Sequence, residues 1–219
     1  MRPADVALML LLACAVGAAA TEQDEGSAGH SDPIVPAGPQ GTWSASLDVY
    51  LYLQEEDDFL MPILAADRDA LHFECRYQYE DLETVSAWVG WSFDTGERLQ
   101  IELVPMAGII VGRTTGIAPG LEMTLSWKNL EFYSESEYVF DSEGVEGDYF
   151  YTWSELSWQA LPWLKLGASA QRTRLYRSEL DIERGLFLAV RRGPVEISVY
   201  GYNLDGDSPF AIVALGASF

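Results

Sequence analysis

From Gly41 onward, apolar and polar residues alternate with a period of two, and almost nowhere with the 3.6-residue period of a helix. In residues 43–54, for example, Leu47 and Val49 belong to an apolar set, and Asp48 lies between them in a polar set. An extended strand places alternate side chains on opposite faces. The pattern therefore predicts strands that are each apolar on one face and polar on the other.

Twelve segments of this kind follow one another. They cover about residues 43–54, 59–66, 71–78, 85–93, 99–103 (continuing into a mixed stretch, 104–112), 121–128, 130–140, 149–158, 164–171, 182–190, 195–200 and 209–219. The second segment departs from the pattern, because it is apolar on both faces and contains Pro62, which cannot donate to a sheet. Most segments are near the length that crosses a bilayer at a tilt, and their number is even.

The connections between these segments differ in a regular way. Every second connection is short: 67–69, 94–96, 128–129, 161–162 and 192–194. The others are mostly longer and more acidic: 55–58, 80–83, 113–119, 141–148, 177–181 and 203–208. Short turns at one end and longer loops at the other are typical of barrels that cross an outer membrane.

Aromatic residues sort by strand end in the same register. Those expected on the apolar face at the short-turn end are Trp43, Trp91, Phe93, Trp127, Trp158 and Phe219, and those expected at the opposite rim are Phe59, Tyr138, Phe140 and Phe150. Two aromatic girdles are expected where a barrel meets the two membrane interfaces. A soluble barrel or sandwich would hold its aromatics in a core, with no reason to sort them by strand end.

The closing stretch Pro209–Phe219 places Ala211, Val213, Leu215 and Ala217 on one face and ends on an aromatic residue. It resembles the last strand of bacterial outer-membrane β-barrels, in which a final Phe is the usual insertion signal. The resemblance covers residues 41–219 and is to this broad class only. It implies an all-β fold, a single transmembrane antiparallel up-and-down barrel of twelve strands (ten to twelve being open), a location in the outer membrane, and contact with the barrel-assembly machinery.

The first forty residues have a different character. Residues 1–20 read as a signal peptide, with Arg2, an apolar core from Val6 to Val16 and the small residues 18–20 before the expected cleavage. An alternative takes Cys14 as a lipidated residue. Residues 21–40 are rich in Gly, Ala, Pro, Ser and acid, and are expected to form a disordered periplasmic linker.

The composition restricts the partners. The sequence has 34 acidic and 13 basic residues, for a net charge of −21. Such a chain repels nucleic acid, whose binding depends on Lys and Arg at the phosphates. Only Cys75 remains after cleavage, so neither an internal disulfide nor a thiolate metal site is expected, and no nucleotide or cofactor fingerprint is present.

If the apolar face meets lipid, the polar face lines the lumen. Its charged members are Asp48, Glu74, Arg76, Glu102, Glu122, Lys128, Glu131, Glu135, Glu137, Glu155, Lys165, Glu183, Arg191 and Glu196. Ten acids and four bases cannot neutralise each other. One interpretation is a narrow water-filled path that favours cations or small polar solutes. The other is a structural barrel whose lumen is plugged by ion pairs and by Tyr50, Tyr52, Tyr133, Tyr200 and Tyr202.

Three further hypotheses concern chemistry outside this lumen. The acidic loops 55–58, 141–148 and 205–207 offer oxygen ligands to cations, although none has calcium-loop spacing. Arg172, Arg174 and Arg177 are candidates for contact with lipopolysaccharide phosphates. A lipid hydrolase would need His72 beside a serine such as Ser92, for which no third, acidic member of a triad is evident. We therefore expect no catalytic residues and no cofactor.

Overall fold

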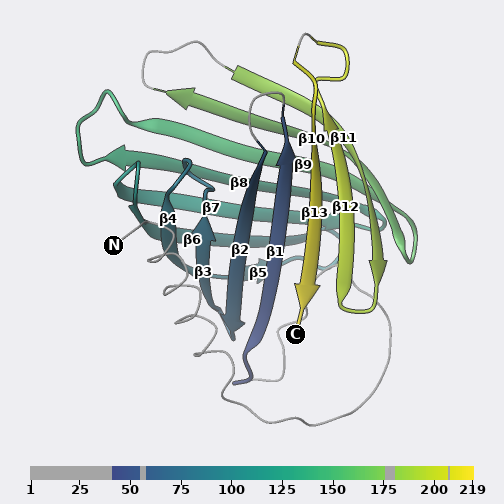
Figure 1. Cartoon of the computed structure of the whole chain (residues 1–219). Helices are drawn as coiled ribbons and strands as arrows, with labels where there is room; N and C mark the ends of the chain where they lie inside the picture. The colour runs from purple at the N-terminus through teal and green to yellow at the C-terminus, as the bar shows by residue number, and fades with distance from the viewer. Residues whose placement is uncertain (1–40, 55–57, 176–180, 207) are drawn as a thin grey trace.

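The computed structural model describes residues 41–54, 58–175, 181–206 and 208–219, and it is an antiparallel β-barrel (Figure 1). The predicted fold class is confirmed. The signal peptide and linker predicted for residues 1–40 lie outside the described residues. The strands are β1 (Ser44–Leu53), β2 (Phe59–Arg68), β3 (Leu71–Tyr77), β4 (Val85–Trp91), β5 (Phe93–Thr95), β6 (Gln100–Val111), β7 (Gly116–Trp127), β8 (Leu130–Asp141), β9 (Tyr149–Leu161), β10 (Leu164–Leu175), β11 (Asp181–Arg192), β12 (Val195–Tyr202) and β13 (Phe210–Ser218).

Pairing between the first and last strands closes the barrel. β1 pairs with β13 from Ser46 opposite Ser218 to Leu53 opposite Ala211. At the end of this ladder, Phe219 and Ala45 exchange two backbone hydrogen bonds, of 2.9 and 2.8 Å. Closure leaves neither strand with an unpaired edge in the membrane, which is the condition for a sheet to cross a bilayer.

The thirteen strands occupy twelve positions in the wall, because β4 and β5 are consecutive pieces of one position. Both pair with β6, and Gly90 opposite Met106 and Phe93 opposite Leu103 belong to one continuous register. Continued through the break, that register would place Trp91 opposite Pro105. Proline has no N–H to donate, so the ladder is interrupted there.

Pro62 in β2 is accommodated for a related reason. Pro62 lies opposite Val49 of β1. The ladder between β2 and β3 ends at Ile63 opposite Arg76, so Pro62 has no partner in β3 within that ladder. A proline at the end of a ladder removes no bond between the two strands. The segment that broke the sequence pattern is therefore a regular strand, and it extends to Arg68.

Two kinds of connection separate the barrel's ends, as predicted. The turn end carries residues 69–70, 96–99, 128–129, 162–163 and 193–194, together with both ends of the described chain. The loop end carries the longer connections. Some predicted boundaries were wrong: the loop predicted over 113–119 is only 112–115, because β7 begins at Gly116, and part of the turn predicted over 94–96 forms β5. The turn predicted over 67–69 is only 69–70, because β2 extends to Arg68. Lys128, with φ of 56°, and Gly193, with φ of 60°, supply the left-handed backbone of two-residue hairpins.

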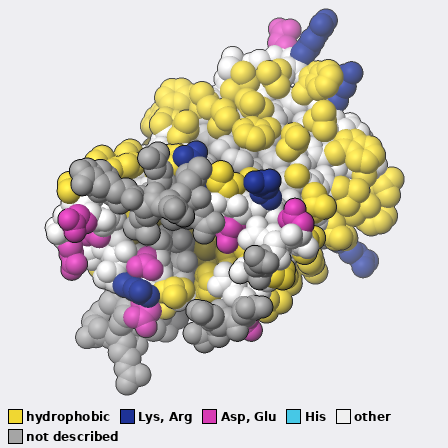
Figure 2. All heavy atoms as spheres, turned by 90° about the horizontal axis from the view of Figure 1, so that it is seen from above, with side chains coloured by type: hydrophobic (Ala, Val, Ile, Leu, Met, Phe, Trp, Pro, Cys, Tyr) yellow, Lys and Arg dark blue, Asp and Glu magenta, His cyan; other side chains and the backbone are white. Residues whose placement is uncertain are grey.

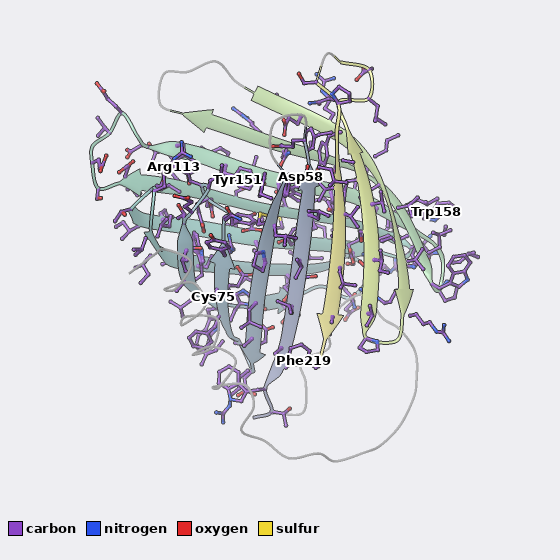
Figure 3. The ribbon with its side chains drawn as sticks, in the orientation of Figure 1. Asp58, Cys75, Arg113, Tyr151, Trp158 and Phe219 are labelled. Atoms are coloured by element: carbon purple, nitrogen blue, oxygen red, sulfur yellow. The ribbon has the colours of Figure 1, made fainter. Side chains whose placement is uncertain are left out.

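The apolar set faces outward, and hydrophobic side chains gather over the outer surface in Figure 2. At the turn end, the side chains of Trp43, Trp91, Phe93, Trp127, Trp158 and Phe219 are all exposed, with Phe219 at 71 %. Trp158 and Phe219 lie at this end in Figure 3, and Asp58 and Arg113 lie at the other. At the loop-end rim, Phe140 is exposed as expected. Phe59 is not part of a girdle: it lies opposite the buried Tyr52 and stacks on it at 4.5 Å between ring centroids.

The interior of the loop-end half is apolar and aromatic. One cluster of buried side chains contains Tyr52, Met61, Trp153, Phe187, Tyr200, Tyr202, Ile212 and Ala214, and a second contains Trp88, Val104, Met106, Ile110, Ala118, Val139 and Tyr149. We call these two clusters together the aromatic layer. Among the described residues, no helix is long and apolar enough to span a membrane.

Candidate functional site

Most charged residues of the polar set come together in the middle and the turn-end half of the barrel, whereas Glu183 lies near the loop end of β11. Thirteen of the fourteen predicted lumen residues lie in strands, and Lys128 lies in the β7–β8 turn. The Lys128 ammonium is placed over the Trp127 ring, 4.7 Å from its centroid, and the residue is exposed. Lys128 was predicted to face the lumen because the alternation was extended one residue beyond Trp127, where β7 ends.

Arg76 of β3 is the centre of the charged interior. Its side chain is fully buried, and its guanidinium faces three carboxylates. Nε donates to Glu74 at 2.6 Å, and Nη1 lies 2.5 Å from Glu135 and 3.3 Å from Glu137. One positive charge among three negative ones leaves this cluster, which we call the Arg76 cluster, with an excess of negative charge if all three carboxylates are ionised.

Aromatic rings hold the Arg76 guanidinium from two directions. Its Cζ atom lies 4.4 Å from the centroid of Tyr79 and 4.7 Å from that of Trp88. These are cation–π distances, and such contacts are strongest where water is excluded. Trp88 in turn lies against the bare backbone of Gly108, where an added Cβ would come within 2.4 Å of the indole.

The β3–β4 loop, residues 78–84, bends into the barrel instead of projecting from it. The carbonyl of Glu80 accepts a hydrogen bond from the Tyr149 hydroxyl at 2.7 Å, and its carboxylate accepts from Trp88 Nε1 at 3.1 Å and from the Ser86 hydroxyl. Burial raises the pKa of the Glu80 carboxyl, and the nearby Arg76 opposes this rise. The sequence predicted residues 80–83 as an ordinary acidic outer loop and gave no signal that Tyr79 and Glu80 would enter the lumen.

The remaining bases form ion pairs near the turn end. Lys165 lies 3.2 Å from Glu131, and Arg191 lies 2.9 Å from Glu196. Other acids are bound by uncharged donors: Glu102 accepts from the Ser92 hydroxyl at 3.1 Å, and Glu155 accepts from Trp153 Nε1 at 2.9 Å. Glu183 is hydrogen-bonded by Gln171.

An acidic cavity of about 220 Å³ lies beside the Arg76 cluster. Its carboxylates are Asp48, Glu74, Glu122, Glu135, Glu155 and Glu196, and its other lining residues include Tyr50, Tyr79, Tyr133, Trp153 and Tyr200. No Lys or Arg is among the described residues that line it. A second cavity, of about 450 Å³, opens near the 162–163 turn and shares Glu196 with the first. Lys165 and Arg191 line the second cavity beside that one carboxylate, so the excess of acid lies in the first cavity.

His72 does not form the Ser–His pair that a hydrolase would need. Its Nδ1 lies 2.7 Å from Asp67 Oδ1, and its Nε2 lies 3.4 Å from Glu74 Oε1. The Ser92 hydroxyl is bound to Glu102. The hypothesis of catalysis through His72 and Ser92 therefore has no support in this geometry.

A closed antiparallel barrel with an apolar outer wall, aromatic rims and a charged interior has the architecture of bacterial outer-membrane β-barrels. The resemblance expected from the sequence is thereby confirmed at the level of the fold.

Comparison with solved structures gives the same result. The chain is similar to the KdgM porin, with a TM-score of 0.57 and 13 % sequence identity, over 80 % of this chain and 99 % of that one. It is also similar to the NanC porin, with a TM-score of 0.54 and 12 % identity, over 79 % and 98 % of the two chains. At these identities the likeness establishes the fold alone. No protein-family model and no curated protein matches the sequence.

Proposed function

We propose that the protein is an outer-membrane channel of narrow bore that favours cations and small polar or cationic solutes. The observation that carries this proposal is the acidic cavity, where six carboxylates face one space without a lining base. Carboxylate rings select cations in channels, and low-dielectric walls strengthen their field. The porin-like fold is consistent with passive passage and with a location in the outer membrane.

The proposed solute differs in charge from that of one structural neighbour. A solved structure of the KdgM porin holds a disordered oligogalacturonate, and this chain matches it with a TM-score of 0.56 and 13 % identity. Galacturonate units carry carboxylates. Six carboxylates on a wall repel such an anion, so we do not transfer that ligand to this chain.

Reversal potentials across a planar bilayer with a KCl gradient test the proposal. We expect wild-type protein to favour K⁺ over Cl⁻, and the double variant Glu122→Gln and Glu155→Gln to lose at least half of that preference. The matched control is Glu143→Gln, which neutralises an exposed acid of the β8–β9 loop. Anion preference in the wild type, or equal selectivity in the double variant, would refute the cation-favouring channel.

A second function, a structural barrel with a plugged lumen, is favoured by one observation. The Arg76 cluster, with Tyr79 and Trp88 on the guanidinium, fills the middle of the interior beside the acidic cavity. If wild-type protein inserts into the bilayer but passes no current at any voltage, the structural function replaces the channel.

The proposed partners follow from the surface. Outer-membrane lipid would cover the apolar outer wall. Lipopolysaccharide phosphates remain candidates for contact with Arg172, whereas Arg177 and the side chain of Arg174 lie outside the described residues. Of the three acidic loops, 141–148 remains a candidate for cation binding, whereas residues 55–57 and 207 of the other two lie outside the described residues. The exposed side chain of Phe219 is available to the barrel-assembly machinery while its backbone seals the seam. Reduced insertion of Phe219→Ala in cells, with unchanged stability of the purified barrel, would support the last partner.

A further inference from the structure

His72, Glu74 and Glu122 bring three possible metal-ligand atoms together inside the barrel. His72 and Glu74 share the inner face of β3, and Glu122 comes from β7, which does not pair with β3. One donor atom from each residue lies within 4.8 Å of the other two. His72 is buried, with 7 % of its surface exposed, and the two glutamates are partly buried. The group is therefore enclosed by the wall, unlike an acidic patch in solvent.

The imidazole is oriented as in known metal sites. Asp67 Oδ1 lies 2.7 Å from Nδ1 and can accept its proton, which leaves the lone pair on Nε2. Metal-bound histidines commonly donate their other ring N–H to a carboxylate in this way, and that contact fixes both the tautomer and the ring plane. Nε2 itself is buried and makes no well-aligned hydrogen bond, its neighbouring acceptor being Glu74 Oε1 at 3.4 Å. An unsatisfied buried ring nitrogen calls for an explanation, and a bound cation supplies one.

The two carboxylates have the capacity to complete the site. Oε2 of Glu74 accepts the hydrogen bond from Arg76 Nε. The other oxygen, Oε1, lies 3.4 Å from His72 Nε2. Ligand atoms about 2.1 Å from a tetrahedral zinc are about 3.4 Å apart, so this pair already has the required spacing. A carboxylate oxygen of Glu122 lies within 4.8 Å of a donor atom of each of these two residues.

Glu122 also lacks a Lys or Arg partner among the described residues. It lies directly opposite Glu135 in the β7–β8 register, and no Lys or Arg of the described residues is within ion-pair distance of it. Glu122 Oε1 accepts a hydrogen bond of 3.3 Å from the Tyr133 hydroxyl. Like charges directly opposite on paired strands are unfavourable, and a divalent cation would offset the repulsion.

We propose that the barrel binds one divalent transition-metal ion through His72 Nε2, Glu74 Oε1 and a carboxylate oxygen of Glu122, with Asp67 as the residue that positions the imidazole. One nitrogen and two carboxylate oxygens suit Zn²⁺, Mn²⁺ or Fe²⁺, whereas Ca²⁺ and Mg²⁺ prefer all-oxygen sites. Water would fill the remaining coordination positions. The site does not depend on the proposed conduction, because a plugged lumen would bind the ion equally well.

The competing arrangement is a protonated His72 held between Asp67 and Glu74 without a metal. Both arrangements use the same hydrogen bond to Nδ1, so the distances alone do not separate them. Metal binding does separate them, because only a neutral imidazole offers a lone pair to the ion.

Isothermal titration of the folded, detergent-solubilised full chain with ZnCl₂ at pH 7.5 tests the proposal. We expect one site per chain, with at least tenfold weaker binding of Ca²⁺ and Mg²⁺. His72→Ala and Glu122→Gln should each weaken Zn²⁺ at least tenfold, and Asp67→Ala should weaken it about 10- to 100-fold. The controls are His30→Ala, which removes the other histidine of the sequence, and Glu97→Gln, which neutralises an exposed acid of the 96–99 turn. Both should bind as the wild type does.

Folding of each variant is checked by its heat-modifiable migration on SDS gels, and Glu122→Gln preserves shape if His72→Ala fails to fold. The proposal would be overturned by no stoichiometric Zn²⁺ binding in the wild type, by unchanged affinity in a folded His72→Ala or Glu122→Gln variant, or by loss of binding in His30→Ala. Equal affinity for Ca²⁺ would also overturn it, because it would remove the role of the imidazole.

Discussion

Nη1 of Arg76 lies 2.5 Å from Oε1 of Glu135, although the two residues belong to strands β3 and β8, which do not pair. Their contact crosses the interior of the barrel. Glu74 and Glu137 flank the same guanidinium, so removal of one side chain leaves three carboxylates without their shared cation.

We therefore predict that Arg76→Met destabilises the barrel and enlarges the current through it. Loss of one partner of a buried ion pair typically costs about 3–5 kcal/mol, because the other charge stays buried and unpaired. Urea unfolding in detergent measures the stability, and single-channel recording measures the conductance. Lys165→Met is the control, since it breaks a two-residue pair nearer the turn end and should cost much less. Equal losses in the two variants would contradict the central role of Arg76.

We predict that Glu80, in the β3–β4 loop, makes the stability of the barrel depend on pH. Burial raises its pKa above the usual 4.5, so the folded state holds this proton more tightly than the unfolded chain does. The contribution of Glu80 to stability is therefore complete below pH 4.5 and is lost as the pH rises through the raised pKa. Glu80→Gln should remove this part of the pH dependence, and its gain in stability over the wild type should grow between pH 4.5 and neutral pH.

The measurement is the urea midpoint of wild type and variant at several pH values, read as the difference between the two curves. Glu143→Gln, at an exposed loop position, should follow the wild type throughout. A constant offset between wild type and Glu80→Gln, with no change across the range, would show that Glu80 is not the group responsible.

We predict that a side chain at Gly108 of β6 would clash with Trp88 inside the barrel. An added Cβ would lie 2.4 Å from the indole of Trp88, which is buried and bound to Glu80 and Arg76. Gly108→Ala must displace the ring, at a cost of about 1–3 kcal/mol for an overpacked core. Gly206→Ala is the matched control, because its nearest neighbour would be 3.5 Å away. Equal heat resistance of the two variants on SDS gels would show that Trp88 yields without cost.

We predict that a charged residue on the lipid-facing wall lowers the stability of the barrel more than one in a loop. Leu156 lies in the middle region of β9 and is 55 % exposed, whereas Val145 is 64 % exposed in the β8–β9 loop. An arginine on the lipid face near the bilayer midplane costs about 2–4 kcal/mol, and one in water costs little. Leu156→Arg should therefore lower stability in lipid vesicles much more than Val145→Arg. Similar stabilities in vesicles would argue that this face does not meet hydrocarbon.

Most of the wall could be predicted from the sequence, because the alternation of side chains is a local property of each strand. Leu47, Leu121 and Leu215 face outward, as their period-two neighbours indicated. The break between β4 and β5 could not be predicted with the same ease. It depends on Pro105 standing opposite Trp91, which is known only once the register is known.

The sequence predicted which charged residues face the interior, but not which of them contact each other. Spacing placed Glu135 and Glu137 on the inner face, but it could not show that both would meet Arg76, which is about sixty residues away and reached by closure of the barrel. The alternation also failed where the inner face itself is apolar, at Val104, Met106 and Ile110. Those side chains pack against each other inside the barrel, so polarity did not identify their direction.

The aromatic layer occupies the loop-end half of the interior, and the carboxylates of the acidic cavity lie in its middle and turn-end half. A permeating cation would thus meet two unlike regions in series. From the loop side it must pass the apolar and aromatic side chains before it reaches the acidic cavity, whereas from the turn side it reaches that cavity without crossing them. The free-energy profile has no mirror symmetry along the axis. Current through a barrel built in this way should rectify, with unequal magnitudes at opposite voltages of equal size.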